Sequence, residues 1–126
     1  MRETDLYPAI KSFLEVRGFE VKAEVNGCDV VARRGVESPV IVELKLGFTL
    51  QLIYQAIDRL ALADQVYIAV ARAKRGLPVE AVKLCRRLGL GLIIVAASAG
   101  GTTRSRATCS GNVSVSRGFS AIAGQT

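Results

Sequence analysis

Two charged residues, Glu43 and Lys45, lie inside an otherwise aliphatic stretch, VIVELKL, which runs from residue 40 to residue 46. The aliphatic run predicts a buried β-strand. Alternate residues of a strand point to the same face, so the two charged side chains share one face of the sheet. Burying two charges is costly unless they are paired or bind a ligand. This stretch is therefore the first candidate for chemistry.

A third charged residue, Asp29, lies on the preceding predicted strand, CDVVARR, over residues 28–34. If the turn between the two strands is centred near residues 36–37, antiparallel partners have numbers that sum to about 72 to 74. That register places Asp29 opposite Glu43 or Lys45. Residues directly opposite each other point to the same face. Two carboxylates and one ammonium group are thus expected to converge on one patch of the sheet.

Two carboxylates this close repel each other unless a cation lies between them. A hard divalent ion suits the site: Mg²⁺, with Mn²⁺ as the alternative, would take oxygen ligands from Asp29, Glu43, the backbone carbonyl of Leu44 and waters. Such an ion can lower the pKa of a bound water and stabilise a phosphorane-like transition state. Lys45 can orient that water, help to deprotonate it and offset the developing charge.

A simpler interpretation is a solvated ladder of charges on an open sheet face, with Asp29 as a cross-strand partner of Glu43 and Lys45. A bare E-x-K tripeptide favours this interpretation. Three features favour a site instead. The strand is otherwise aliphatic, an acidic residue of matching parity precedes Glu43 by 14 positions, and a helix that carries Gln55 follows at once.

Hydrophobic periodicity predicts the elements that must position these residues. The expected elements are a helix over 4–17, strands over 19–25, 28–34 and 40–46, a helix over 49–63, a strand over 65–71, a helix over 77–89 and a strand over 90–96. The three early strands form an antiparallel meander, whereas strand–helix–strand units require parallel neighbours. The prediction is an α/β fold in the order αβββαβαβ, one mixed sheet with helices on its faces.

The helix that follows the charged strand is expected to start after Thr49, whose side chain can cap it. Its apolar stripe is predicted at Leu50, Ile53, Ile57, Leu60 and Ala61. The polar residues are predicted to lie off that stripe, namely Gln51, Gln55, Asp58 and Arg59.

Composition excludes several function classes. The chain has 126 residues, half of them hydrophobic, which is enough for one domain with a core. It has no histidine, which removes His-based catalysis, His–metal sites and Ser-His-Asp triads. Its three cysteines are far apart and suggest neither a zinc site nor a disulfide framework, so a reducing cytoplasm is the expected compartment. The N-terminus lacks the apolar run of a signal peptide, and no membrane partner is expected.

The composition changes after Ala96. Of the last 30 residues, 20 are Ser, Gly, Ala or Thr and none is acidic. Such a segment cannot build a packed core, so residues 97–126 are expected to form a flexible tail after a domain that spans residues 1–96. The stretch NVSVSRGF within it could pair as an edge strand, but the sheet is expected to be complete by Ala96.

The chain resembles the PD-(D/E)XK nuclease superfamily, whose core is αβββαβ with an acidic residue on the second strand and E-x-K on the third. The matching positions are Asp29 in GCDVVA and the Glu43-Leu44-Lys45 run in VIVELKL, and the likeness spans roughly residues 3–95. The chain looks closest to a bacterial branch of that superfamily and is broadly similar to archaeal Holliday-junction resolvases and RecB-like nuclease domains. Cys28 replaces a proline, at a position that varies in the superfamily. The resemblance implies a restriction-endonuclease-like fold, here with an additional α–β unit.

The resemblance also implies a Mg²⁺-dependent phosphodiesterase, a nuclease that cuts DNA, with the three charged strand residues as its catalytic set. Gln55 resembles a glutamine that contacts the site or the DNA in several branches, and a surface glutamine is the alternative. Glu3 resembles an auxiliary acid of some branches, although an acid in the first helical turn also suits the helix dipole. Glu24 alternates onto the polar face of the first strand, where it could join the site or stay solvated.

A net charge of +6 suits a polyanionic partner such as nucleic acid. Basic residues at loops and strand ends could track phosphates, although a basic loop is usually only solvated. These residues are Arg33, Arg34, Arg72, Lys74 and Arg75. The alternatives to a nuclease are a catalytically inactive nucleic-acid-binding domain of the same fold and a protein-interaction domain. A homodimer is compatible with the resemblance, but the sequence carries no interface signature.

Overall fold

The computed structural model describes residues 5–25, 28–72, 76–96 and 113–115. Three of the residues predicted to act, Glu3, Lys74 and Arg75, lie outside these ranges, as does most of the predicted tail. For Glu24 the structure describes the backbone, which lies in a strand, and not the side chain. The outcome of each sequence prediction is given below for the described residues.

The elements occur in the predicted order. They are α1 (Leu6–Val16), β1 (Glu20–Val25), β2 (Cys28–Arg33), β3 (Val40–Lys45), α2 (Leu50–Arg59), β4 (Gln65–Ala71), α3 (Val79–Leu88), β5 (Gly91–Val95) and β6 (Val113–Val115). In the sheet the strands lie side by side in chain order. The meander β1–β2–β3 is antiparallel, and β3–β4 and β4–β5 are parallel. The predicted α/β class and mixed sheet are confirmed. Within the described ranges, no helix has the length and apolar character needed to cross a bilayer.

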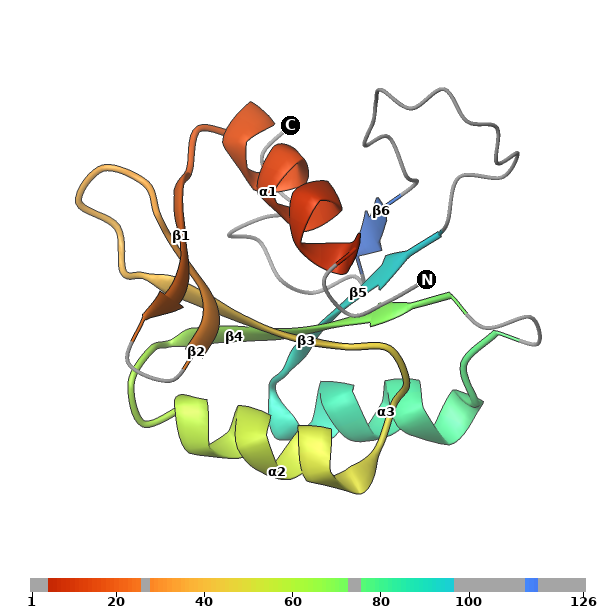
Figure 1. Ribbon diagram of the computed structural model, residues 1–126. Helices are drawn as coiled ribbons and strands as arrows, with labels where there is room; N and C mark the ends of the chain where they lie inside the picture. Colours follow the sequence, from red (N-terminus) through yellow and green to blue (C-terminus); the bar gives the residue numbers. More distant parts are fainter. Residues whose placement is uncertain (1–4, 26–27, 73–75, 97–112, 116–126) are drawn as a thin grey trace, which may run out of the picture.

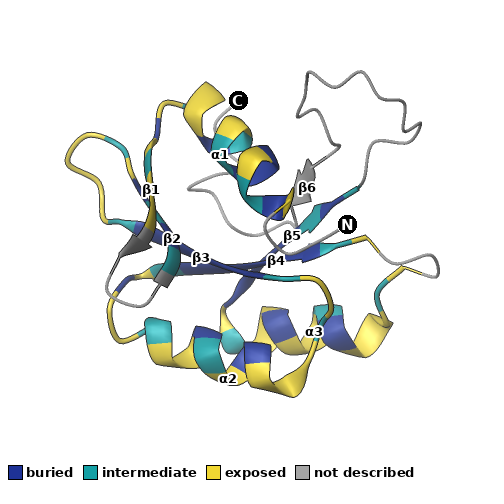
Figure 2. Cartoon of the chain, viewed as in Figure 1, coloured by how far each residue is buried: buried dark blue, intermediate teal, exposed yellow. Residues whose placement is uncertain are grey.

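The helices cover both faces of the sheet, with α1 on one face and α2 and α3 on the other (Figure 1). Each face has its own core, because successive strand residues point to opposite sides. Under α1 the core includes Leu6, Ile10, Leu14, Val30, Val42, Leu44, Tyr67 and Ile93. Under α2 and α3 it includes Ile41, Leu52, Ile53, Ala56, Val66, Ile68, Val70, Cys85 and Leu92. The strands β3, β4 and β5, which lie between the helical layers, are almost wholly buried, whereas β1 and β2 carry exposed residues (Figure 2).

The pairing of β2 with β3 decides where the charged residues point. The register pairs Val30 with Val42 and Ala32 with Val40, so partner numbers sum to 72. Val42 belongs to the core under α1 and Ile41 to the core under α2 and α3. By the same alternation Glu43 lies on the α2 side, and one further step of the register sets Asp29 opposite it. The predicted shared face is therefore confirmed.

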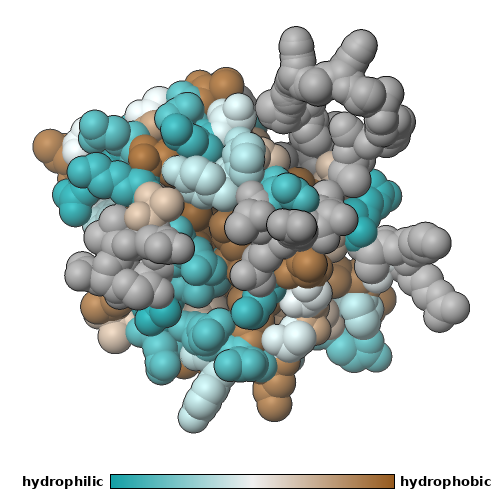
Figure 3. All heavy atoms as spheres, in the orientation of Figure 1, coloured by the Kyte–Doolittle hydropathy of each residue, from teal (hydrophilic) through white to brown (hydrophobic). Residues whose placement is uncertain are grey.

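Helix α2 packs through a different stripe from the one predicted. Its buried residues are Leu52, Ile53 and Ala56, whereas Leu50 is 78% exposed and Ile57 is 37% exposed. The predicted stripe is thus wrong at Leu50, Ile57 and Ala61, the last of which is exposed beyond the end of the helix. It holds at Ile53, and Leu60 is half-buried against the core. Two apolar patterns overlap on this helix, and packing selects the one in which the small Ala56 lets the helix approach the sheet. Brown hydrophobic spheres accordingly lie among teal ones on the lower part of the surface, where α2 runs (Figure 3).

The helix begins where the sequence indicates. Thr49 has an extended backbone, and its Oγ1 accepts a 3.1 Å hydrogen bond from the backbone N–H of Leu52. This cap satisfies one of the first amide groups of the helix, which have no intrahelical partner. The cap fixes the start of α2 only five residues after β3 ends.

The sheet continues beyond the strand at which it was expected to end. β6 pairs antiparallel with β5, with Ile93 opposite Val115 and Val95 opposite Val113. The expectation that the sheet is complete by Ala96 is therefore wrong. Valine favours strands, and a strand of only three residues suits the edge of a sheet.

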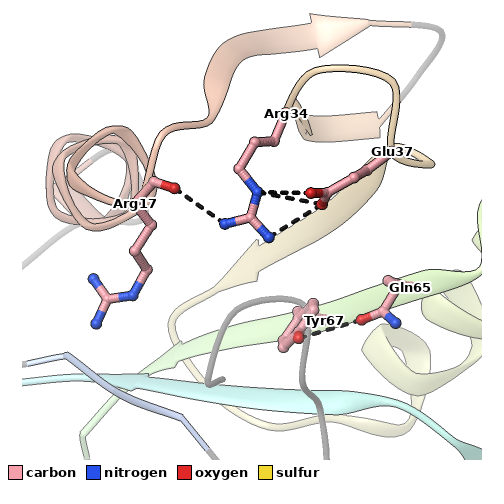
Figure 4. A network of polar contacts seen from close by, with 5 residues as sticks. All are labelled: Arg17, Arg34, Glu37, Gln65 and Tyr67. Atoms are coloured by element: carbon pink, nitrogen blue, oxygen red, sulfur yellow. Dashed lines mark hydrogen bonds and ion pairs between the residues drawn. The ribbon is translucent and has the colours of Figure 1, made fainter. Parts of the chain in front are cut away.

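Hydrogen bonds from Arg34 link the end of α1 to the turn between β2 and β3 (Figure 4). The Arg34 guanidinium donates to the Arg17 carbonyl at 3.1 Å and to the Glu37 carboxylate at 3.1–3.2 Å. It also lies over the ring of Phe19, 4.4 Å from the centroid. These contacts fix α1 relative to the hairpin that carries Asp29.

Tyr67 depends on a glycine of the neighbouring strand. Its ring is fully buried under α1, its hydroxyl lies 3.4 Å from Oε1 of Gln65, and its register partner on β5 is Gly91. A Cβ atom at Gly91 would stand 2.4 Å from a ring carbon of Tyr67. The ring therefore occupies the space that any side chain at residue 91 would need.

We expect Gly91→Ala to destabilise the fold by about 1–3 kcal/mol, the usual range for overpacking a core. Urea unfolding measures this change. Gly47→Ala is the matched control, since a Cβ there meets nothing within 4 Å. In a Tyr67→Leu background the cost of Gly91→Ala should shrink, because the clash is removed. An equal cost in both backgrounds would show that the ring is not the cause.

Candidate active site

The carboxylate of Asp29 is held by the backbone of the next strand. Its Oδ2 accepts a 2.8 Å hydrogen bond from the backbone N–H of Leu44. The ladder between β2 and β3 ends at Val30 and Val42, so the side chain takes the place of a strand carbonyl for that N–H. Asp29 is thereby fixed at the point where β2 and β3 part, beside Glu43.

Glu43 is buried. Only 3% of its surface is exposed, and it is the one charged residue classed as buried within the described ranges. Its Oε2 accepts a 2.8 Å hydrogen bond from Nε of Arg59, whose side chain is 22% exposed. The solvated-ladder interpretation is wrong for Glu43, because this side chain has almost no contact with water.

The electrostatic surroundings of Glu43 favour its neutral form. Burial raises the pKa of its carboxyl above the usual value, the hydrogen bond from Arg59 lowers it, and the nearby negative charge of Asp29 raises it again; the net shift is upward. Arg59 therefore compensates only part of the cost of burying a carboxylate next to a second one. A further cation beside the two acids would favour the ionised form of Glu43.

Lys45 lies at the end of β3 on the same face as Glu43. It is half-buried and pairs in register with Val70, a member of the core under α2 and α3. The next residue, Leu46, is 41% exposed, so the strand meets the surface here. Of the two charged residues of β3, Lys45 is therefore the one nearer to solvent.

Gln55 and Glu24 lie on two other elements, α2 and β1. Gln55 is half-buried on α2, one helical turn before Arg59. The β1–β2 register pairs Ala23 with Val30 and Val25 with Cys28, which sets the backbone of Glu24 level with Asp29. The positions of Glu24, Asp29 and Glu43 therefore follow one another across three adjacent strands.

The residue that sequence reasoning missed is Arg59, which was placed off the apolar stripe of its helix. Leu52, Ala56 and Arg59 follow one another at steps of four and three residues, the spacing of a single helix face. An arginine at the third position of a buried stripe needs an anionic partner, and Glu43 is the buried anion. The signal was present, but the predicted rotation of α2 concealed it.

Lys74 and Arg75, two of the basic residues proposed to track phosphates, lie outside the described residues. Arg72 follows β4 at the end of the sheet where Val70 pairs with Lys45, whereas Arg33 and Arg34 lie at the end of β2 remote from Asp29. Arg33 and Arg72 are exposed at the ends of β2 and β4. Arg34 is held by Glu37 and the Arg17 carbonyl, at the end of α1. Its contacts are those of a structural residue rather than those of a phosphate ligand.

Asp29, Glu43 and Leu44 provide some, but not all, of the oxygen ligands that a divalent cation needs. Asp29 and Glu43 supply two neighbouring carboxylates, each held through one oxygen by a donor of the chain. The N–H of Leu44 points away from β4 towards Asp29, and the N–H and C=O of one strand residue share an edge, so its carbonyl points to the same side. Oxygen donors of this kind are those Mg²⁺ takes. Among the side chains the structure describes, no group of three or more acidic, His or Cys residues gathers.

Comparison of the chain with known protein families, with curated proteins and with solved structures finds no match.

The raised pKa of Glu43 predicts a pH effect on stability. Between the pKa of an unfolded glutamate, about 4.3, and the higher folded value, the folded chain binds more protons than the unfolded chain. The contribution of Glu43 to the free energy of unfolding must then fall as the pH rises through that window. Glu43→Gln removes this contribution while keeping an oxygen for Arg59.

Urea unfolding of both proteins from pH 4 to pH 8, without divalent ions, measures the effect. The stability of wild type minus that of Glu43→Gln should decrease as the pH rises. An increase with pH would mean that the Arg59 ion pair outweighs burial.

Proposed function

We propose that this chain is a metal-dependent phosphodiesterase, a nuclease that hydrolyses DNA phosphodiester bonds. The observation that carries the proposal is a pair of neighbouring carboxylates on adjacent strands, the buried Glu43 and the half-buried Asp29, with Lys45 on the same face. The negative charge of Asp29 adds to the cost of burying the carboxylate of Glu43, and Arg59 offsets only part of that cost. A bound Mg²⁺ or Mn²⁺ would offset the rest. The order αβββαβ agrees with the resemblance to the PD-(D/E)XK superfamily, and a restriction-endonuclease-like arrangement is part of this proposal.

Each residue has a distinct task in this proposal. Asp29, Glu43 and the carbonyl of Leu44 would hold the ion, which when bound supplies an activated water and charge stabilisation for the phosphoryl group. The Leu44 N–H keeps the Asp29 carboxylate in place. Lys45 orients the attacking water and offsets negative charge on the phosphate. Gln55 lies one turn from Arg59 and is suited to contact the substrate backbone.

A second candidate function is a catalytically inactive nucleic-acid-binding or protein-interaction domain. The 2.8 Å bond between Arg59 and Glu43 favours it, because a guanidinium already serves as a cation for that carboxylate. On this alternative the ion pair is permanent and structural. Binding of a divalent ion to the protein without substrate separates the two candidates.

The nuclease proposal predicts a split between the acids and the lysine. Asp29→Asn and Glu43→Gln should each lose Mg²⁺ binding and DNA cleavage, because each removes a charge that the ion needs. Lys45→Ala removes a positive charge beside the ion, so metal should bind at least as well, while cleavage falls roughly 10²- to 10⁴-fold. Calorimetric Mg²⁺ titration beside a cleavage assay on linear, nicked and branched DNA measures both.

Lys83→Ala is the matched control, since Lys83 is exposed on α3, and it should change neither quantity. Cleavage by Lys45→Ala at the wild-type rate would remove β3 from consideration as an active site.

DNA binding should survive the loss of cleavage and should weaken as salt rises, because phosphate contacts release counterions. Glu43→Gln should bind DNA at least as tightly as wild type, since it removes a negative charge. Fluorescence anisotropy at a series of KCl concentrations measures both properties. No binding to any DNA form, or binding that is indifferent to salt, would favour a protein-interaction domain.

A further inference from the structure

Arg59 holds a position that a metal site does not require. Its Nε lies 2.8 Å from Oε2 of Glu43, and the carboxylate it contacts is 96% buried as a side chain. A hydrogen bond between charged groups at this distance is about twice as strong as one between neutral groups. The guanidinium and a divalent ion would therefore compete for the charge of the same carboxylate.

The location of Arg59 at the end of a helix would allow its guanidinium to leave the carboxylate of Glu43. It is the last residue of α2, and its side chain is 22% exposed, against 4% for the side chain of Glu43. The C-terminal end of a helix carries partial negative charge from its last carbonyls and stabilises a cation nearby. A guanidinium that leaves Glu43 thus remains in favourable surroundings without unfolding the helix.

We propose that Arg59 is the internal counter-ion of the site, a positioning residue that occupies Glu43 when no metal is bound and yields that carboxylate to the divalent ion. This inference rests on the proposed function, because it concerns the same two carboxylates. Arg59 then lowers the affinity for metal while it keeps the empty site folded. Once displaced, its guanidinium stays beside the ion, where it suits an anionic phosphate.

The test measures metal affinity directly, with Mn²⁺ and Mg²⁺ titrated calorimetrically into the full-length protein at pH 8. Arg59→Gln removes the competing charge, and the strength of a charged hydrogen bond corresponds to a gain of about 10- to 100-fold in affinity. Arg59→Lys keeps the charge without the planar fork and should fall between wild type and Arg59→Gln. Urea unfolding without metal checks that each variant is folded.

Arg33→Gln is the matched control, because it removes the same charge from an exposed residue of β2, four positions from Asp29. That separation is about 13 Å along a strand, beyond the screening length at 0.15 M salt. The control should bind metal as wild type does. Adding Glu43→Gln to Arg59→Gln should abolish the gain.

The outcomes separate this inference from the proposed function. If wild type binds metal through Asp29 and Glu43, but folded Arg59→Gln binds with equal or lower affinity, only the counter-ion inference is overturned. If wild type binds metal and Arg59→Gln binds it about 10- to 100-fold more tightly, both stand. If only Arg59→Gln binds metal, Arg59 does not yield Glu43 in the wild type, and both are overturned. If no variant binds metal, both are overturned, and the ion pair is structural.

Discussion

The carboxylate of Glu43 is buried beneath α2, and its neighbours are arranged around the need to accommodate that charge. Arg59 meets one oxygen at 2.8 Å, but burial and the charge of Asp29 still leave the pKa of Glu43 raised. A side chain selected only for stability would not be a carboxylate here, since a buried ion pair seldom outperforms well-packed hydrophobic residues. The unfavourable charge is the reason to attribute chemistry to this strand.

The same constraint explains the rotation of α2. Burying Leu52 and Ala56 brings Arg59 onto the face that meets Glu43, whereas the predicted stripe would have placed it towards solvent. In exchange Leu50 and Ile57 are left exposed. The short connection from β3 and the Thr49 cap limit the helix to few orientations, and the observed one pairs the buried acid. Packing and electrostatics therefore agree on this helix.

The sequence carried enough information to place Asp29, Glu43 and Lys45 on one face, because strand alternation and a short antiparallel turn depend on local residues. The element order followed from periodicity in the same way. The rotation of α2 could not be obtained locally, since two apolar patterns overlap on it and only contact with the sheet chooses between them. Arg59 was missed for that reason. The stretch that forms β6 was a possible edge strand, but the sequence could not decide its pairing, because that pairing joins segments far apart in the chain and three residues leave a weak pattern.

The contact between Tyr67 and Gly91 gives the α1 side of the sheet an unusual property. The space above residue 91 is filled by a ring from the next strand, and the glycine itself contributes no side chain to it. Shortening the tyrosine would therefore leave a cavity in the core under α1, next to the bare backbone of Gly91 on β5. Dry apolar voids of this kind take up small aromatic molecules. A variant with a shortened Tyr67 would thus offer a cavity for phenol-sized molecules, on the face of the sheet opposite Asp29 and Glu43.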